Sequence, residues 1–175
     1  NEISHDLGHQ NVYFLEDDPP FLRTREENHP YDLWELLEGM ECFCVPHHVA
    51  QSMTPWQWEN FDPEKMPVAE IFSNHGRAEY TGNQPHHSPH PVPTIEGHTW
   101  VDQLNTGKKL GAIASGDDHW AWPGTVGLTG VWAKELDREE IYHEIKSRHC
   151  YATTAARVIL HFDVNGAEMG SLIKT

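Results

Sequence analysis

The chain has 175 residues, of which 38% are hydrophobic and 22% are charged, a composition typical of one globular domain with a real core. No apolar run approaches the length of a membrane span, so a membrane-spanning protein is excluded. The formal net charge of −15 argues against a nucleic-acid partner, because an extended polyanion would be repelled. The 14 histidines indicate metal binding instead, since imidazole is the commonest ligand of first-row metals.

The three cysteines are too few for a disulfide framework in a chain of this length, and we expect them to be buried thiols. The composition predicts a soluble protein. No segment resembling a signal peptide opens the sequence, and both cytoplasm and periplasm stay open as the compartment. The chain begins at Asn1, in what reads as the middle of an element. We therefore expect a preceding segment or a partner chain.

The first part of the chain alternates between strand and helix patterns. Residues 2–4 resemble the end of a strand, and residues 10–15 form a short strand pattern. Residues 30–39 begin with Pro, end with Gly and place apolar side chains on one face, which predicts a helix. Residues 42–45 and 68–72 are the next predicted strands.

The following segment, residues 73–97, is rich in Pro, His and Gly and predicts a long loop. Residues 99–104 predict a short helix, and an apolar strand begins at Leu110. Strand candidates follow at residues 128–133 and 158–164.

Between those two strand candidates, Asp137 and Glu140 resemble a capping box that opens a helix extending to about Arg148. Asn165-Gly166 predicts a hairpin turn. The alternation of strands and helices favours a mainly parallel sheet or part of a barrel, and the hairpin favours an antiparallel β module at the C-terminal end.

The chain is organised around the sequence LGAIASGDDHWAWP, residues 110–123, in which an apolar strand ends at acidic residues and a histidine. Asp117 and His119 are two positions apart, so in an extended segment their side chains point to the same side. Such a pair at the end of a strand suits one metal ion. Trp120 and Trp122 follow directly, as core residues or as the wall of a pocket.

Four groups of His, Asp and Glu lie near predicted strand ends, and together they predict a metal site. Nitrogen and oxygen donors without a thiolate pattern suit Zn, Mn or Fe, in more than one copy, with a bridging hydroxide that attacks an ester. Glu70 is either a ligand or a carboxylate that fixes a neighbouring histidine. The four groups are Glu2 with His9, His47 with His48, Glu70 with His75, and Asp117 with His119.

Two other observations narrow the function. His86, His87 and His90 lie among Pro and Ser, so we interpret them as surface residues of the long loop. Nucleophile-elbow, Walker and dinucleotide-binding motifs are absent from the sequence, which argues against a hydrolase with a nucleophilic serine.

The order of several segments resembles a poorly characterised bacterial family within the PHP (polymerase and histidinol phosphatase) superfamily of metal-dependent phosphoesterases. The segments are GHQNVYF at 8–14, LWELLEG at 33–39, VPHH at 45–48, VAEIFS at 68–73, LGAIASGDDH at 110–119, GLTGVWAKELDREEIYHEI at 127–145 and RHCYATTAARV at 148–158.

The resemblance implies the C-terminal portion of a distorted (β/α)7 barrel over residues 1–156, followed at 157–175 by the start of a β-rich region. It implies two or three metal ions in the complete site. By position, Glu2, His9, one of His47 and His48, and the Asp117/His119 pair would be the ligands.

Two features depart from the superfamily pattern. The His-x-His motif of its first barrel strand does not occur in these residues, which implies a missing N-terminal segment or partner chain. Ala155 stands where the pattern has Gly in a Thr-Thr-Gly turn.

The leading hypothesis is a metal-dependent hydrolase of small phosphate esters that uses a metal-bound hydroxide, with Asp117 and His119 as catalytic residues. The alternatives are a non-catalytic half-barrel subunit that needs a partner, and a metal-dependent hydrolase of a non-phosphate bond. Residues predicted to support the ligands or hold the substrate are Glu70, His75, Asp118, Arg148 and Arg157.

Overall fold

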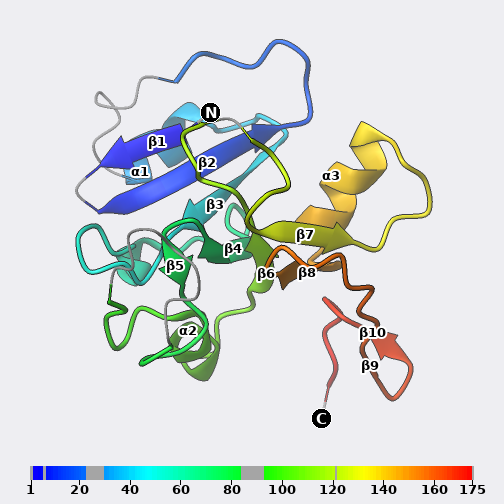
Figure 1. Cartoon of the computed structure of the whole chain (residues 1–175). Helices are drawn as coiled ribbons and strands as arrows, with labels where there is room; N and C mark the ends of the chain where they lie inside the picture. Colours follow the sequence, from blue (N-terminus) through cyan, green and yellow to red (C-terminus); the bar gives the residue numbers. More distant parts are fainter. Residues whose placement is uncertain (1, 6, 23–29, 84–92, 121, 175) are drawn as a thin grey trace.

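The computed structural model describes residues 2–5, 7–22, 30–83, 93–120 and 122–174. Most regular structure in this part is strand, and the three α-helices are short (Figure 1). His86, His87 and His90 lie outside the described residues. The elements are β1 (Glu2–His5), β2 (Gly8–Phe14), α1 (Pro30–Leu36), β3 (Cys42–His47), the 3-10 helix η1 (Trp58–Asn60), β4 (Val68–Ser73), β5 (Gly76–Arg77), α2 (Trp100–Asn105), β6 (Gly111–Ala114), β7 (Leu128–Val131), α3 (Arg138–Lys146), β8 (Cys150–Thr153), β9 (Asp163–Val164) and β10 (Ala167–Glu168).

The prediction that residues 1–156 form part of a (β/α)7 barrel is wrong. The described strands form four small open sheets, ordered β1-β2-β3, β5-β4-β6, β7-β8 and β10-β9. The expectation of a mainly parallel sheet is also wrong, because among the described pairs only β4 and β6 run parallel. The strands are short, and consecutive strands such as β1 and β2 fold directly back on each other, which requires antiparallel pairing. The result is a small mixed α/β domain.

The first sheet places two histidines opposite each other. In the antiparallel register of β2 and β3, His9 pairs with His47, and in that of β1 and β2, Ser4 pairs with His9. Gly8 has a φ of +113°, and a Cβ there would lie 2.7 Å from the Cα of Trp56. Only glycine fits this contact, which sets the start of β2 immediately before His9.

The second sheet brings two strand ends together. β4 and β6 pair in parallel from Val68 opposite Gly111 to Phe72 opposite Ala114. The Ser115 N–H continues the ladder by donating to the Phe72 carbonyl at 3.0 Å. Because parallel strands end at the same edge, the segments that follow β4 and β6 leave the sheet side by side.

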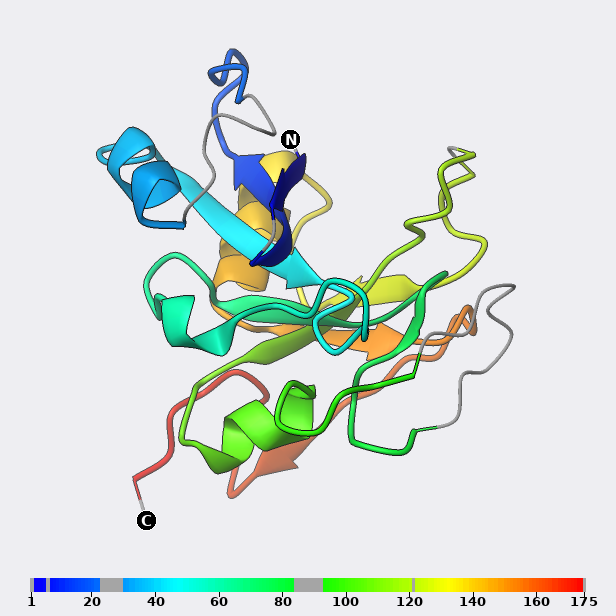
Figure 2. The same ribbon diagram turned by 90° about the vertical axis from the view of Figure 1, so that its left-hand side faces the viewer.

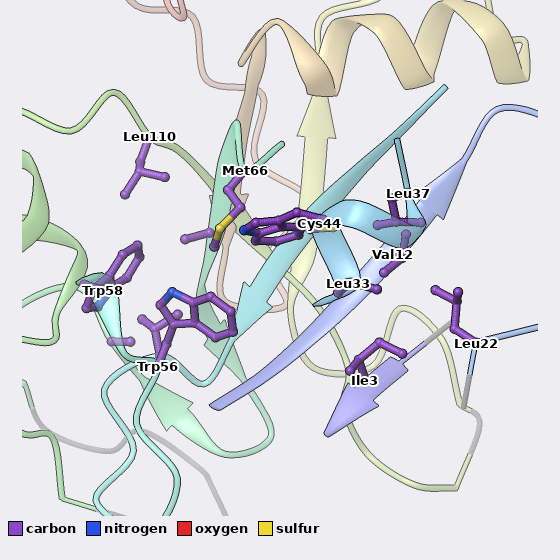
Figure 3. Close-up of a cluster of buried hydrophobic side chains, with 14 of the residues drawn as sticks. Ile3, Val12, Leu22, Leu33, Leu37, Cys44, Trp56, Trp58, Met66 and Leu110 are labelled. Atoms are coloured by element: carbon purple, nitrogen blue, oxygen red, sulfur yellow. The ribbon is translucent and has the colours of Figure 1, made fainter. Parts of the chain in front are cut away.

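The larger hydrophobic core lies between the first sheet, α1 and the segment from Val49 to Met66 (Figure 3). Trp56 is fully buried at its centre, beside Met66 and Trp58. A second cluster joins Phe43 and Val68 to Tyr142 of α3. The two clusters cover opposite sides of β3 and β4, and these two strands carry His47 and Glu70.

The helix α3 begins where the sequence predicted, but its cap differs from a full capping box. The Asp137 carboxylate accepts the Glu140 N–H at 2.9 Å, as expected. The Glu140 carboxylate accepts instead from the Lys134 N–H at 3.0 Å. In α2, Thr99 and Asp102 form a complete capping box.

The C-terminal segment, residues 157–174, departs from the predicted strand at 158–164. Only Asp163 and Val164 are paired, with Glu168 and Ala167, across the predicted Asn165-Gly166 turn. This hairpin lies at the opposite end of the molecule from β1 and β2 (Figure 1). The boundary at residue 157 between two regions stays a prediction. None of the described helices has both the length and the apolar character that crossing a bilayer needs.

Candidate metal centre

The side chains of the proposed centre come from strand ends and the turns after them. His9 lies near the start of β2, His47 ends β3, and His48 follows it. Asp117 lies three residues after the end of β6, and His75 lies between β4 and β5. Sequence positions as far apart as 9 and 119 are therefore brought to one edge.

The first group consists of His9, His47 and His48. The Nε2 atom of His48 and the Nδ1 atom of His9 are 3.2 Å apart, and the His47 and His48 rings meet edge to face with centroids 4.4 Å apart. The Glu2 carboxylate lies 3.5 Å from His9 Nδ1 and 3.8 Å from His47 Nε2. One donor atom from each histidine can be chosen so that all three lie within 4.8 Å of one another, close enough to converge on one ion.

The second group is centred on Asp117. One carboxylate oxygen lies 3.2 Å from Nδ1 of His47 and 3.2 Å from Nε2 of His75. The other oxygen lies 3.3 Å from Nε2 of His119. Asp117 therefore joins the two groups, and His75, Asp117 and His119 form a second set whose donor atoms lie within 4.8 Å.

Glu70 is fully enclosed between the two groups. One of its oxygens accepts the His48 backbone N–H at 3.0 Å, and the other accepts the Ser115 hydroxyl. Both oxygens are thus used to hold the turn after β3 and the turn after β6. This geometry favours the positioning alternative for Glu70, although its carboxylate also falls within 4.8 Å of donor atoms of His47 and Asp117.

The turns that carry the donors are strained. Among the described residues, six non-glycine residues have positive φ, and three of them are His48 (37°), Asp117 (43°) and His119 (53°). A non-glycine residue in this region costs about 1–3 kcal/mol and persists only where its surroundings fix it. Backbone strain of this kind gathers at binding and catalytic sites.

The electrostatics separate the histidines into two kinds. Burial, helped by the positive charge of neighbouring His47, lowers the pKa of His9, and burial with His47 and His9 lowers the pKa of His48 to about 3. Burial also opposes charge on His47, but its hydrogen bond to Asp117 and the nearby Glu70 outweigh this and raise its pKa. The hydrogen bond to Asp117 raises the pKa of His75.

The carboxyl groups of Asp117 and Glu70 also differ in the direction of their pKa shifts. Burial alone would raise the pKa of Asp117, but hydrogen bonds from His47 and His75 bring it far below its ordinary value. Burial raises the pKa of Glu70, and the bonds from Ser115 and the His48 N–H only partly offset this effect. Asp117 is therefore the group that carries the negative charge a cation needs.

The donor set fits a divalent ion of the Zn, Mn or Fe type. Within the described part of the chain, the buried Nε2 of His47 and Nδ1 of His48 have no hydrogen-bond partner, and unpartnered buried polar atoms are costly. Imidazole nitrogens with a carboxylate suit these ions, and the lowered pKa values of His9 and His48 favour the neutral form that binds a metal. None of the three donor groups among the described residues contains a cysteine, and burial raises the pKa of the Cys44 and Cys150 thiols.

Some residues proposed from the sequence lie elsewhere. Asp118 accepts the backbone N–H groups of Trp120 and Trp122. The Arg148 guanidinium donates to the Gly170 carbonyl at 3.4 Å, and Arg157 lies on a surface hollow beside β7 and β8. Among the described residues, neither Arg148 nor Arg157 forms a hydrogen bond or ion pair with a histidine of the proposed centre.

Sequence reasoning undervalued His75 and did not assign roles to Gln51 and Ser115. The Gln51 amide lies 3.3 Å from Nδ1 of His75 and orients that ring toward Asp117. The sequence predicted a long loop around His75, because β5 is only two residues long and therefore has no recognisable strand pattern. Ser115 had a usable signal, its position immediately after an apolar strand.

Comparisons with known proteins assign the chain to a family of unstated activity. Residues 73–169, more than half of the chain, match the family model described as "Protein of unknown function (DUF3604)", and the chain belongs to this family. It is 29% identical over 157 residues to an uncharacterized protein of Chlamydia pneumoniae and 28% identical over 158 residues to one of Chlamydia trachomatis. Each alignment covers 82% of this chain and 25% of the relative, so the chain spans about a quarter of the length of these curated relatives. No solved structure gives a significant match.

Proposed function

We propose that this chain carries the metal centre of a metal-dependent hydrolase that acts on phosphate esters. The observation that carries the proposal is the convergence of five histidines and Asp117, whose donor atoms form sets that lie within 4.8 Å of one another. The resemblance to PHP phosphoesterases supplies the substrate class, and the family match leaves the activity open.

A bound divalent ion would supply a Lewis acid that polarises the phosphoryl group and lowers the pKa of a water molecule. The chain's own groups do the rest. Asp117 holds His47 and His75 in fixed orientations, while Glu70 holds the turns on which His48 and Asp117 lie. These contacts preorganise the donors before any ligand arrives.

His119 differs from the other histidines because its side chain is 78% exposed. Its Nε2 atom lies 3.3 Å from an oxygen of the Asp117 carboxylate. We assign to His119 the solvent-exposed ligand position of the second donor set, where a phosphate ester can reach the bound ion.

The first test is elemental analysis of the purified chain by plasma mass spectrometry. We compare wild type with Asp117→Asn/His119→Ala and with a matched surface control, Asp32→Asn/His143→Ala. Wild type and control should both retain about two ions of Zn, Mn or Fe per chain, and the site variant should lose them. Equal metal content in the site variant and wild type would overturn the proposal.

The second test concerns the bond that is cleaved. The metal-loaded protein should hydrolyse p-nitrophenyl phosphate, and the site variant should not. Metal retention with hydrolysis of p-nitrophenyl acetate alone would replace the phosphate ester with a carboxylic ester. A chain that holds no metal would be a non-catalytic subunit.

A further inference from the structure

The connection between β6 and β7 is a loop with a closed base. The Gly127 N–H donates to the Ser115 carbonyl at 2.9 Å, and a Cβ on Gly127 would lie only 2.4 Å from that oxygen. The two ends of the loop therefore meet without room for a side chain. We call its described residues, 116–120 and 122–126, the tryptophan loop.

The tryptophan loop begins with the proposed donors Asp117 and His119 and continues directly into two exposed indoles. Trp120 is 80% exposed and Trp122 is 69% exposed. The Asp118 carboxylate accepts the backbone N–H groups of both, at 3.1 and 3.2 Å, which fixes the turn that carries them. In Figure 2 the yellow-green loop stands out from the sheets.

Trp120 and Trp122 are more exposed than the other five tryptophans. Trp34, Trp56 and Trp58 are buried in the main core, Trp100 is partly buried against it, and Trp132 is 37% exposed. Compact loops whose ends meet ordinarily pack their own side chains inside. Two large apolar side chains left in water, beside a cluster of metal-type donors, indicate a surface that binds something.

We propose that Trp120 and Trp122 bind the organic part of the substrate, a phosphate ester whose leaving group carries a planar aromatic or nucleobase ring. This rests on the proposed function. Trp120 and Trp122 follow His119 by one and three positions on the same loop, so the leaving group of a phosphoryl group held at Asp117 and His119 would lie within their reach. Indoles offer large rigid faces on which planar rings stack, with little loss of side-chain entropy.

The charge of the chain limits the size of this ligand. With a net charge of −15, the protein repels an extended polyanion, so a single phosphorylated ring fits better than a nucleic-acid strand. A stacked ring adds on the order of ten-fold or more to affinity. Discrimination between ring-bearing and ringless phosphate compounds is therefore the property to measure.

The test compares two phosphonates whose carbon–phosphorus bond is not hydrolysed. Phenylphosphonate carries a planar ring and ethylphosphonate does not. Binding of each to the Zn-loaded or Mn-loaded protein is measured by calorimetry for wild type, Trp120→Ala/Trp122→Ala and Trp120→Phe/Trp122→Phe. The control is Leu136→Ala, at an apolar residue on the distant β7–α3 connection that is even more exposed.

Wild type and control should prefer phenylphosphonate by about ten-fold. The double Ala variant should lose this preference while keeping its metal and its affinity for ethylphosphonate, and the double Phe variant should keep most of it. An unchanged preference in the double Ala variant would overturn this inference alone, as would equal binding of the two compounds by wild type. Failure of the metal-loaded protein to bind any phosphonate or inorganic phosphate would overturn the phosphoesterase proposal itself.

Discussion

Two regions depart from the rule that apolar side chains are buried and polar side chains are exposed. One is the strand-end edge with the histidines, and the other is the C-terminal segment at residues 157–174. At the edge, polar side chains such as His47, His48 and Glu70 are buried. In the C-terminal segment, apolar side chains such as Ile159, which is 83% exposed, lie in water. The comparison teaches that a buried polar group and an exposed apolar group each need their own explanation.

The two regions also differ in what holds them. At the edge, each proposed donor has polar neighbours from distant segments, and Glu70 joins two turns. The C-terminal segment is held by three side-chain bonds to its backbone, from Tyr151 to the Val158 carbonyl, from Trp132 to the Leu160 carbonyl and from Arg148 to the Gly170 carbonyl. We therefore expect substitutions to have large effects at the edge and small effects in the C-terminal segment.

Among substitutions at the proposed centre, the largest expected effect on stability is that of Glu70→Ala. It would leave the buried His48 N–H and the Ser115 hydroxyl without acceptors, and we expect the free energy of unfolding to fall by about 2–4 kcal/mol. Urea unfolding of the metal-free chain measures this. Glu70→Gln keeps an acceptor and should lose less, while Glu38→Ala on the surface serves as the control. A loss below about 1 kcal/mol for Glu70→Ala would show that Glu70 does not hold the two turns.

The next effect is on pH dependence. The pKa values of His47 and His75 are raised, so metal must displace protons from these residues near neutral pH. Affinity should therefore rise with pH until the pH exceeds their folded-state pKa values, by up to about ten-fold per unit for each proton displaced. His48, with a pKa of about 3, stays neutral and contributes no such dependence above pH 5.

Calorimetric titration with Zn²⁺ in buffers of different ionisation enthalpy, at pH 6 and pH 8, counts the protons released. More protons should be released at pH 6. In the metal-free chain, the same histidine contacts make a stabilising contribution below pH 6.5 that is lost as the pH rises through the raised pKa values. Proton release that does not change between the two pH values would contradict the arrangement around Asp117.

A smaller and opposite effect is expected at Ala155, between the two regions. Its φ of 63° is left-handed, which explains why the related sequence pattern has glycine there. Ala155→Gly should stabilise the chain by about 0.5–1 kcal/mol, because the relief of strain exceeds the added backbone entropy. Thermal and urea unfolding measure this change. Ala152→Gly, within β8, should destabilise by a similar amount, and the same sign for both substitutions would be inconsistent with this account.

The smallest effect is expected for Ile159→Ala. Because this side chain is already in water, its truncation should change the free energy of unfolding by less than about 0.5 kcal/mol. The matched substitution Ile113→Ala, in the buried core beside α3, should cost about 2–5 kcal/mol. A large loss for Ile159→Ala would mean that the C-terminal segment is packed as tightly as the core.

The sequence located most strands and the three α-helices, because apolar periodicity, Pro, Gly and caps are local signals. It did not locate the partners of those strands. The alternation of strand and helix patterns suggested a mainly parallel sheet, yet β3 pairs antiparallel with β2. Pairing is decided by long-range backbone hydrogen bonds, and a local pattern does not record them. The apolar run at 158–164 shows the same limit of a local pattern. It predicted a strand, but of these residues only Asp163 and Val164 pair with another described strand.

Proximity at strand ends was the part of the site that could be anticipated. The groupings around His9, His47 and Asp117 followed from each lying near an expected strand end. The role of Glu70 stayed open, because a ligand and a positioning carboxylate have the same sequence signature. His75 was undervalued because its orientation depends on Gln51, 24 positions away.

The position of Glu70 also has a thermodynamic consequence. Because one carboxylate holds the turns of both His48 and Asp117, the two sets of donors cannot move independently. An ion in the first set would restrict the strained turns and reduce the ordering cost of the second. We therefore expect the two ions to bind with positive cooperativity, so that chains with one ion are rarer than chains with none or two.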